Sequence, residues 1–182
     1  GRRVLDLYGG HCVNTLGAGD PGLGAVLAEQ WQRLSFVTNL LDHQPRRAFQ
    51  AAFGALLPPL GGGDAWRVFC SNSGAEANEN AVKLALYAGR GSAGRAERRK
   101  VLVFAGGFHG RTAAAAAMTD GGGAFPSPPF DVLRVRFGDT SAASAAIDAS
   151  VAAVVLEPYQ SLAGVVEPPA GFLEALRGAC DE

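Results

Sequence analysis

The sequence predicts an α/β fold built on a mostly parallel, wound sheet. From residue 66 onward, short apolar runs typical of buried strands alternate with longer segments of helical periodicity. Such alternation favours parallel strands joined by right-handed helical crossovers. The chain has 182 residues, enough for one sizeable core, and its apolar content of 48% argues against disorder.

The N-terminal part is expected to contain turns followed by two helices. Residues 4–16 are interpreted as short strands and turns. A helix is expected to begin at Asp20 as N-cap, with Pro21 in its first turn, and to continue to about residue 34. A second helix is expected at 45–57, where a pair of prolines ends it.

The clearest helix start follows a short strand expected at 66–70. Ser73 and Glu76 have the spacing of a capping box, and Gly89 stands where a C-terminal cap is expected. The helix between them is expected at 75–88. Its buried face is expected to consist of small and apolar residues, namely Ala77, Ala81, Leu84, Ala85 and Ala88.

The rest of the chain is expected to contribute three strands and three helices. The strands are expected at 101–105, 132–136 and 151–156. The helices are expected at 113–117, 140–150 and 169–179. Clusters of Gly and Pro predict loops at 61–63 and 120–129.

Charge, hydropathy and cysteine usage exclude several classes of function. The formal net charge is −1, so no basic excess points to nucleic acid. No apolar stretch approaches the ~20 residues of a membrane-spanning helix. Cys12, Cys70 and Cys180 are odd in number and far apart, which suggests core thiols in a reducing compartment and neither a disulfide framework nor a zinc site.

Polar side chains follow three of the predicted strands. These clusters are Ser73-Gly74-Ala75, Phe108-His109-Gly110-Arg111 and Glu157-Pro158-Tyr159-Gln160. Ligands of open α/β sheets bind at the carboxyl ends of the strands, so the clusters are expected to converge on one site. The unpaired N–H groups at the helix start after Ser73 suit a phosphate, although an ordinary capped helix has the same residues.

Segments spread over almost the whole chain resemble the class III, pyridoxal-phosphate-dependent aminotransferases, and within them the acetylornithine or succinylornithine type. The matching segments include Asp6-Leu7-Tyr8-Gly9-Gly10-His11, Asn72-Ser73-Gly74-Ala75-Glu76-Ala77-Asn78-Glu79-Asn80, Phe108-His109-Gly110-Arg111-Thr112 and Glu157-Pro158. The resemblance implies a partial fold-type I transferase. Residues 1–44 would be an N-terminal segment with part of the small domain, and 45–182 part of the cofactor-binding large domain.

The resemblance implies pyridoxal 5′-phosphate as cofactor and assigns residues to it. Gly74 and Ala75, beside Ser73, would offer the phosphate backbone amides with little crowding. Phe108 would stack on the ring, since aromatic faces gain ~0.5–1.5 kcal/mol from such contacts. No metal is expected.

Other residues receive substrate-binding or supporting roles by the same resemblance. Arg111 would bind the substrate carboxylate through two parallel hydrogen bonds. His109 is either close to the cofactor or simply packed, and Glu157 is expected near the cofactor as an organiser. Asn14 and Asn39 either line the substrate entrance or are plain surface-turn residues.

The implied activity is transamination of N-acetylornithine or N-succinylornithine with 2-oxoglutarate in arginine metabolism, by a ping-pong mechanism. The partners would be a small-molecule amino donor and a 2-oxo acid, in a cytoplasmic homodimer. The family's Schiff-base lysine matches neither Lys83 nor Lys100. We therefore assign no catalytic residue and expect an N-terminal fragment that is inactive alone.

Departures from the family pattern leave other functions open. Leu162 stands where ornithine-type relatives carry an acid, so a class III ω-aminotransferase for GABA or ornithine is an alternative. Residues 17–22 also match the dinucleotide motif G-x-G-x-x-G, with Asp42 twenty residues later. The segment before them is a poor buried strand, which argues against a dinucleotide-binding domain. A non-catalytic relative is a further alternative.

Overall fold

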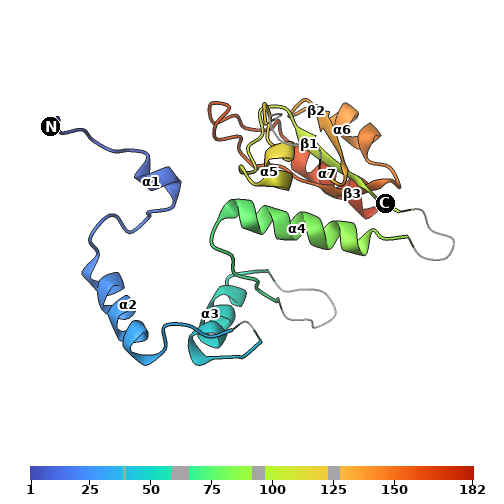
Figure 1. The fold of residues 1–182 in the computed structure, drawn as a ribbon. Helices are drawn as coiled ribbons and strands as arrows, with labels where there is room; N and C mark the ends of the chain where they lie inside the picture. Colours follow the sequence, from blue (N-terminus) through green and yellow to red (C-terminus); the bar gives the residue numbers. More distant parts are fainter. Residues whose placement is uncertain (39, 59–65, 92–96, 123–127) are drawn as a thin grey trace. The chain divides into compact units, whose positions relative to one another are not determined.

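A computed structural model describes residues 1–38, 40–58, 66–91, 97–122 and 128–182. These residues form two compact units, Gly1–Val68 and Phe69–Glu182. The elements of both are labelled in Figure 1. The division after residue 44 stays a prediction. The expected loop at 61–63, the middle of the loop at 120–129, and Asn39 lie outside the described residues.

The first unit contains three helices: α1, Gly9–Cys12; α2, Pro21–Arg33; and α3, Gln44–Gly54. Asp20 caps α2 as predicted, because its carboxylate accepts a hydrogen bond of 2.7 Å from the Leu23 amide. The short strands expected at 4–16 are wrong. The chain instead turns at α1 with φ near +60° in four successive residues, which the adjacent Gly9 and Gly10 make accessible.

The second unit contains a three-stranded parallel sheet with strand order β2-β1-β3. Its strands are β1, Lys100–Phe104; β2, Asp131–Val135; and β3, Val151–Val154. Central β1 pairs with β2 from Lys100↔Asp131 to Phe104↔Val135. These observations confirm the predicted α/β class and all three strands. The strand expected at 66–70 is wrong, because these residues join no ladder of the described sheet.

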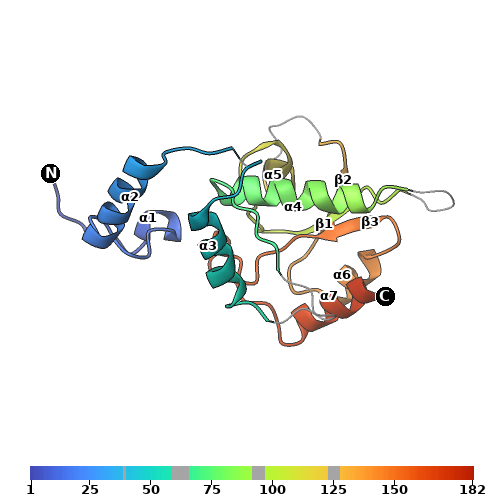
Figure 2. The same ribbon diagram turned by 90° about the horizontal axis from the view of Figure 1, so that it is seen from below.

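Helices cover both faces of this sheet: α4, Gly74–Ala88, and α5, Ala113–Met118, on one face, and α6, Thr140–Ala146, and α7, Phe172–Asp181, on the other. Figure 2 shows the two layers on opposite sides of the strands. The alternation of side chains along β1 produces this arrangement. Val101 and Val103 pack with Val82 of α4, whereas Phe104 packs with Phe172 of α7.

The buried face of α4 differs from the predicted one. Val82 is buried at 2% exposure, whereas Leu84 is 63% exposed. Asn78 and Glu79 lie on the half-buried side because both make hydrogen bonds to the loop after β1. The sequence had predicted a buried face made of alanines and Leu84, because small and apolar residues usually face the core of a helix-covered sheet.

Two smaller expectations also change. Helix α6 ends at Ala146, because Ile147 leaves the helical conformation and packs on the Phe104–Phe172 cluster. The three cysteines are exposed within the described residues, so the expectation of core thiols is wrong. No helix in the described part of the chain is long and apolar enough to cross a membrane.

Candidate functional site

The start of α4 presents two free backbone donors. Ser73 Oγ accepts a hydrogen bond of 3.2 Å from the Glu76 amide, and the Glu76 carboxylate accepts one of 2.7 Å from Asn72. Among the described residues, the amides of Gly74 and Ala75 have no acceptor. A Cβ at Gly74 would meet nothing within 4 Å. This open, partly positive helix end therefore fits a phosphate.

The loop after β1 is held through its backbone amides. Gly106 donates to Asp120 at 2.7 Å, Phe108 to Glu157 at 2.8 Å, and His109 to Thr119 at 2.9 Å. Each acceptor is a side chain from another segment. Three hydrogen bonds thus hold the backbone of this loop, including the residue that bears the Phe108 ring.

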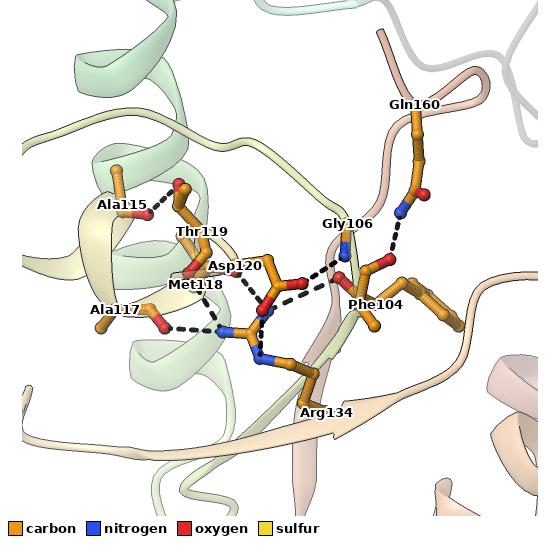
Figure 3. A network of polar contacts seen from close by, with 10 residues as sticks. Phe104, Gly106, Ala115, Ala117, Met118, Thr119, Asp120, Arg134 and Gln160 are labelled. Carbon is orange, nitrogen blue, oxygen red and sulfur yellow. Dashed lines mark hydrogen bonds and ion pairs between the residues drawn. The ribbon is translucent and has the colours of Figure 1, made fainter. Parts of the chain in front are cut away.

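Two residues after β3 reach this same loop. Glu157 accepts from the Phe108 amide with one oxygen and from the Ser161 amide, at 3.2 Å, with the other. The Gln160 side chain, 3% exposed, donates to the Ala105 carbonyl at 2.8 Å (Figure 3). The structure therefore brings the ends of β1 and β3 together, as the sequence predicted.

Gly110 joins the loop to the start of α4. A Cβ on Gly110 would lie 2.6 Å from the Ala75 Cβ and 3.0 Å from the Ala115 Cβ. Its φ of +122° lies in the region that favours glycine. This contact places the start of α4 directly against the Phe108–Arg111 segment.

The short helix α5 is capped at both ends by side chains from other elements. At its N-terminus, Glu79 of α4 accepts hydrogen bonds from the amides of Ala114 (2.8 Å) and Ala115 (3.3 Å). At its C-terminus, Arg134 of β2 donates to carbonyls of Ala117, Met118 and Thr119 at 3.1–3.2 Å (Figure 3). A carboxylate and a guanidinium thus complement the two poles of the helix dipole.

The Glu79 contacts predict a pH-dependent stability. Burial alone would raise the pKa of Glu79, but hydrogen bonds from Thr112, Ala115 and Ala114 outweigh it and leave the pKa below the usual 4.5. The native state therefore favours the ionised form. The stability it contributes is present above pH 4.5 and is lost as the pH falls through the lowered pKa.

We therefore expect Glu79→Gln to lower the free energy of unfolding by about 1 kcal/mol near neutral pH, and by less at about pH 4, below the usual pKa of 4.5. Urea denaturation of both proteins at the two pH values measures this difference. Glu29→Gln is a suitable control, because among the described residues Glu29 makes only an exposed ion pair with Arg33 on α2. A Glu79→Gln effect that is equal at both pH values would contradict the expectation.

His109 is buried at 3% exposure, and its Nε2 has no hydrogen-bond partner in the described structure. Burial lowers the pKa of His109, the Glu157 carboxylate partly opposes this, and Arg134 adds to the lowering. The imidazole is thus kept neutral at physiological pH. The His109 amide donates to the Thr119 hydroxyl, and the His109 carbonyl accepts from the Asn78 side chain. These two hydrogen bonds stabilise the loop.

Phe108 and Arg111 are the more accessible members of the segment. Phe108 is half-buried, and the exposed Arg111 side chain has no hydrogen-bond or ion-pair partner among the described residues. A shallow hollow of about 410 Å³ is lined by Gly106, Gly107, Phe108, Thr119, Asp120, Gly121, Leu162 and Ala163. Gly74 and Ala75 do not line it, so the start of α4 with its two free amides lies outside this hollow.

Neither lysine is placed to reach this region. Lys100 begins β1, at the opposite end of the strand from the polar loop, and lies 4.0 Å from Asp148. Lys83 is on the exposed side of α4.

Sequence reasoning gave no individual role to several residues that build the site. Asn78, Glu79 and Gly110 stood within its motifs, whereas Thr119, Asp120 and Arg134 were missed altogether. One signal was present for the two caps of α5. The helical residues AAAAAM include no polar side chain, so groups at both ends of this helix had to be capped by the flanking Thr112 and Thr119 or by distant residues.

Comparison with known proteins decides the family. The profile of the class-III aminotransferases matches residues 1–182, the whole sequence. The chain belongs to the class-III aminotransferase family. Members of this family depend on pyridoxal phosphate, so the expected enzyme class and cofactor are confirmed at the level of the family.

Curated relatives of this class-III aminotransferase chain include acetylornithine aminotransferases. That of Mycobacterium tuberculosis is 41% identical over 97% of this chain and 42% of its own length. That of Methanopyrus kandleri is 40% identical over 100% of this chain and 45% of its own length. The chain thus spans less than half the length of these relatives.

Solved structures agree with the family fold. An ornithine aminotransferase from Toxoplasma gondii, with partial occupancy of pyridoxal phosphate at its active site, matches with a TM-score of 0.79 at 26% identity. The match covers 96% of this chain and 41% of that protein. The predicted fold class, a partial pyridoxal-phosphate transferase domain with a parallel sheet, is thereby confirmed.

Proposed function

We propose that this chain is the phosphate-binding part of an aminotransferase that moves an amino group from N-acetylornithine or N-succinylornithine to 2-oxoglutarate. The identity of about 40% to acetylornithine aminotransferases supports this substrate class. The main structural support is the pair of free amides at Gly74 and Ala75. The close approach of Gly110 to Ala75 brings these amides next to the Phe108–Arg111 segment.

Pyridoxal phosphate, when bound, supplies an electron sink for chemistry at the amino-bearing carbon. The amides of Gly74 and Ala75 hold its phosphate, and the start of α4 adds a favourable partial charge. Ser73 orders this turn by capping α4. The half-buried Phe108 contributes an aromatic face for the ring.

Three further residues act around this centre. The unpartnered Arg111 guanidinium binds the carboxylate of the amino donor through paired hydrogen bonds. Glu157 holds the Phe108 amide and so orients the loop that carries the ring. His109, kept neutral by burial, packs beside Gly107 of the same loop.

A second substrate class is favoured by one observation. Leu162, which is 63% exposed, lines the hollow beside Phe108. An apolar side chain in place of the acid of ornithine-type relatives suits an ω-aminotransferase acting on another terminal amine, such as GABA. A cytoplasmic homodimer remains a prediction of the family resemblance.

The phosphate site can be tested with a single backbone change, Gly74→Pro. Proline removes the Gly74 N–H, yet it is favoured at the first position of a helix. The preceding Ser73 has φ −153° and ψ 161°, which proline tolerates in its neighbour. We expect Gly74→Pro to weaken pyridoxal phosphate binding about tenfold, because one hydrogen bond to a charged group is lost.

The measurement is a fluorescence titration of pyridoxal phosphate into the protein encoded by the complete reading frame. Gly74→Ala is the comparison variant, since it keeps the amide and its Cβ meets nothing within 4 Å. Equal dissociation constants for the two variants would refute the phosphate assignment. Assays of the unmodified protein on N-acetylornithine, ornithine and GABA then decide the substrate class.

A further inference from the structure

Helix α4 carries more than the phosphate-binding amides. One turn after Ala75, two side chains of the same helix form hydrogen bonds with the segment after β1. Asn78 Nδ2 donates a hydrogen bond of 2.8 Å to the His109 carbonyl. Glu79 Oε1 accepts one of 2.6 Å from the Thr112 hydroxyl. The two contacts span 31 and 33 positions in sequence and lie on adjacent helical residues.

These anchor points adjoin the two residues with proposed ligand-binding roles. His109 directly follows Phe108, and Thr112 directly follows Arg111. Asn78 and Glu79 lie four positions after Gly74 and Ala75, about 6 Å further along a rigid helix. The helix therefore links the phosphate donors to the ring-bearing and carboxylate-binding residues through two short connections.

The Glu79 contact also fixes the direction in which the chain leaves Arg111. Thr112, the N-cap of α5, makes no side-chain hydrogen bond to its own helix. Glu79 takes that place by accepting from the Thr112 hydroxyl and from the Ala114 and Ala115 amides. The backbone immediately after Arg111 is thus held by α4 itself.

We propose that Asn78 and Glu79 are positioning residues that set the placement of Phe108 and Arg111 relative to the phosphate-binding amides of α4. The inference rests on the proposed function and extends it. Asn78 acts on the cofactor ring through Phe108, and Glu79 acts on the substrate carboxylate through Arg111. The two residues should therefore affect different measurable constants.

The test uses the protein encoded by the complete reading frame and the variants Asn78→Ala and Glu79→Ala. Asn78→Ala is expected to weaken pyridoxal phosphate binding about tenfold, since its hydrogen bond to the loop is lost. Glu79→Ala is expected to raise the KM for the amino donor about tenfold, with a smaller change in the pyridoxal phosphate dissociation constant.

Asn80→Ala is the matched control, because Asn80 is half-buried on α4 and has no hydrogen bond among the described residues. If a variant does not fold, Thr112→Val removes the Thr112–Glu79 hydrogen bond and keeps the Glu79 bonds to the Ala114 and Ala115 amides. Asn78→Asp removes the donor on the helix. Thr112→Val should reproduce the raised KM. Glu79→Gln, which keeps an acceptor oxygen, should restore part of the parent KM.

The outcomes separate this inference from the proposed function. If the parent protein binds no pyridoxal phosphate or does not transaminate, the proposed function fails and the inference falls with it. If the parent is active but both variants match Asn80→Ala in dissociation constant and KM, even with a lowered melting temperature, the contacts only stabilise the fold. The positioning role is then refuted, and the proposed function stands.

Discussion

Replacing Gly110 by alanine is expected to destabilise the Phe69–Glu182 unit by about 3 kcal/mol. The added Cβ would lie 2.6 Å from the Ala75 Cβ and 3.0 Å from the Ala75 Cα, so the helix backbone itself must move. The φ of +122° adds strain for any residue with a side chain. Urea denaturation of the variant and the parent measures the difference.

Gly164→Ala is the matched control, because Gly164 has a φ of +105° but its Cβ would meet nothing within 4 Å. It should lose only the backbone term of about 1 kcal/mol. Adding Ala75→Gly to Gly110→Ala should recover part of the loss, since it removes the nearest atom. Equal effects of Gly110→Ala and Gly164→Ala would show that the close approach to α4 is unimportant.

Replacing Arg134 by methionine is expected to cost about 2–3 kcal/mol. The change keeps much of the apolar stem but leaves the carbonyls at the end of α5 without their donors. The ion pair with Asp120, 3.8 Å long and partly exposed, adds little. Arg134→Lys should be almost as harmful, because a compact ammonium does not reproduce the fork of the guanidinium.

The control for this prediction is Arg136→Met, two residues further along the same strand direction. The exposed Arg136 side chain has no hydrogen-bond or ion-pair partner in the described parts of the chain. Thermal unfolding of the three variants should therefore rank Arg136→Met as close to the parent. An Arg134→Met protein as stable as Arg136→Met would mean that water replaces the guanidinium without loss.

The features that sequence reasoning predicted correctly depend on short-range chemistry. Asp20 and Ser73 each cap a helix by accepting from an amide three residues later, so the signal lies within one turn. The strand predicted at 101–105, observed as Lys100–Phe104, is recognisable because residues 101–104 are apolar on both faces, as is typical of a central parallel strand. The family resemblance rested on the same local motifs.

The features that it predicted wrongly depend on distant partners. Asn78 and Glu79 are polar and were not included in the predicted buried face. Their hydrogen-bond partners are 31 or more positions away, and these contacts place both residues on the half-buried side of α4. Residues 66–70 have the composition of a strand but join no ladder in the described sheet. A strand needs a neighbouring strand to pair with, and composition does not show whether one is present.

Local chain chemistry thus specifies the α/β class, the start of α4 with its free amides, and the family to which the chain belongs. Packing in three dimensions decides how those amides meet the other site residues. Gly110 touches Ala75, Glu79 caps α5, and Glu157 holds Phe108 through contacts between segments far apart in sequence. Such contacts depend on the positions of both partners in space, and no spacing along the chain encodes those positions.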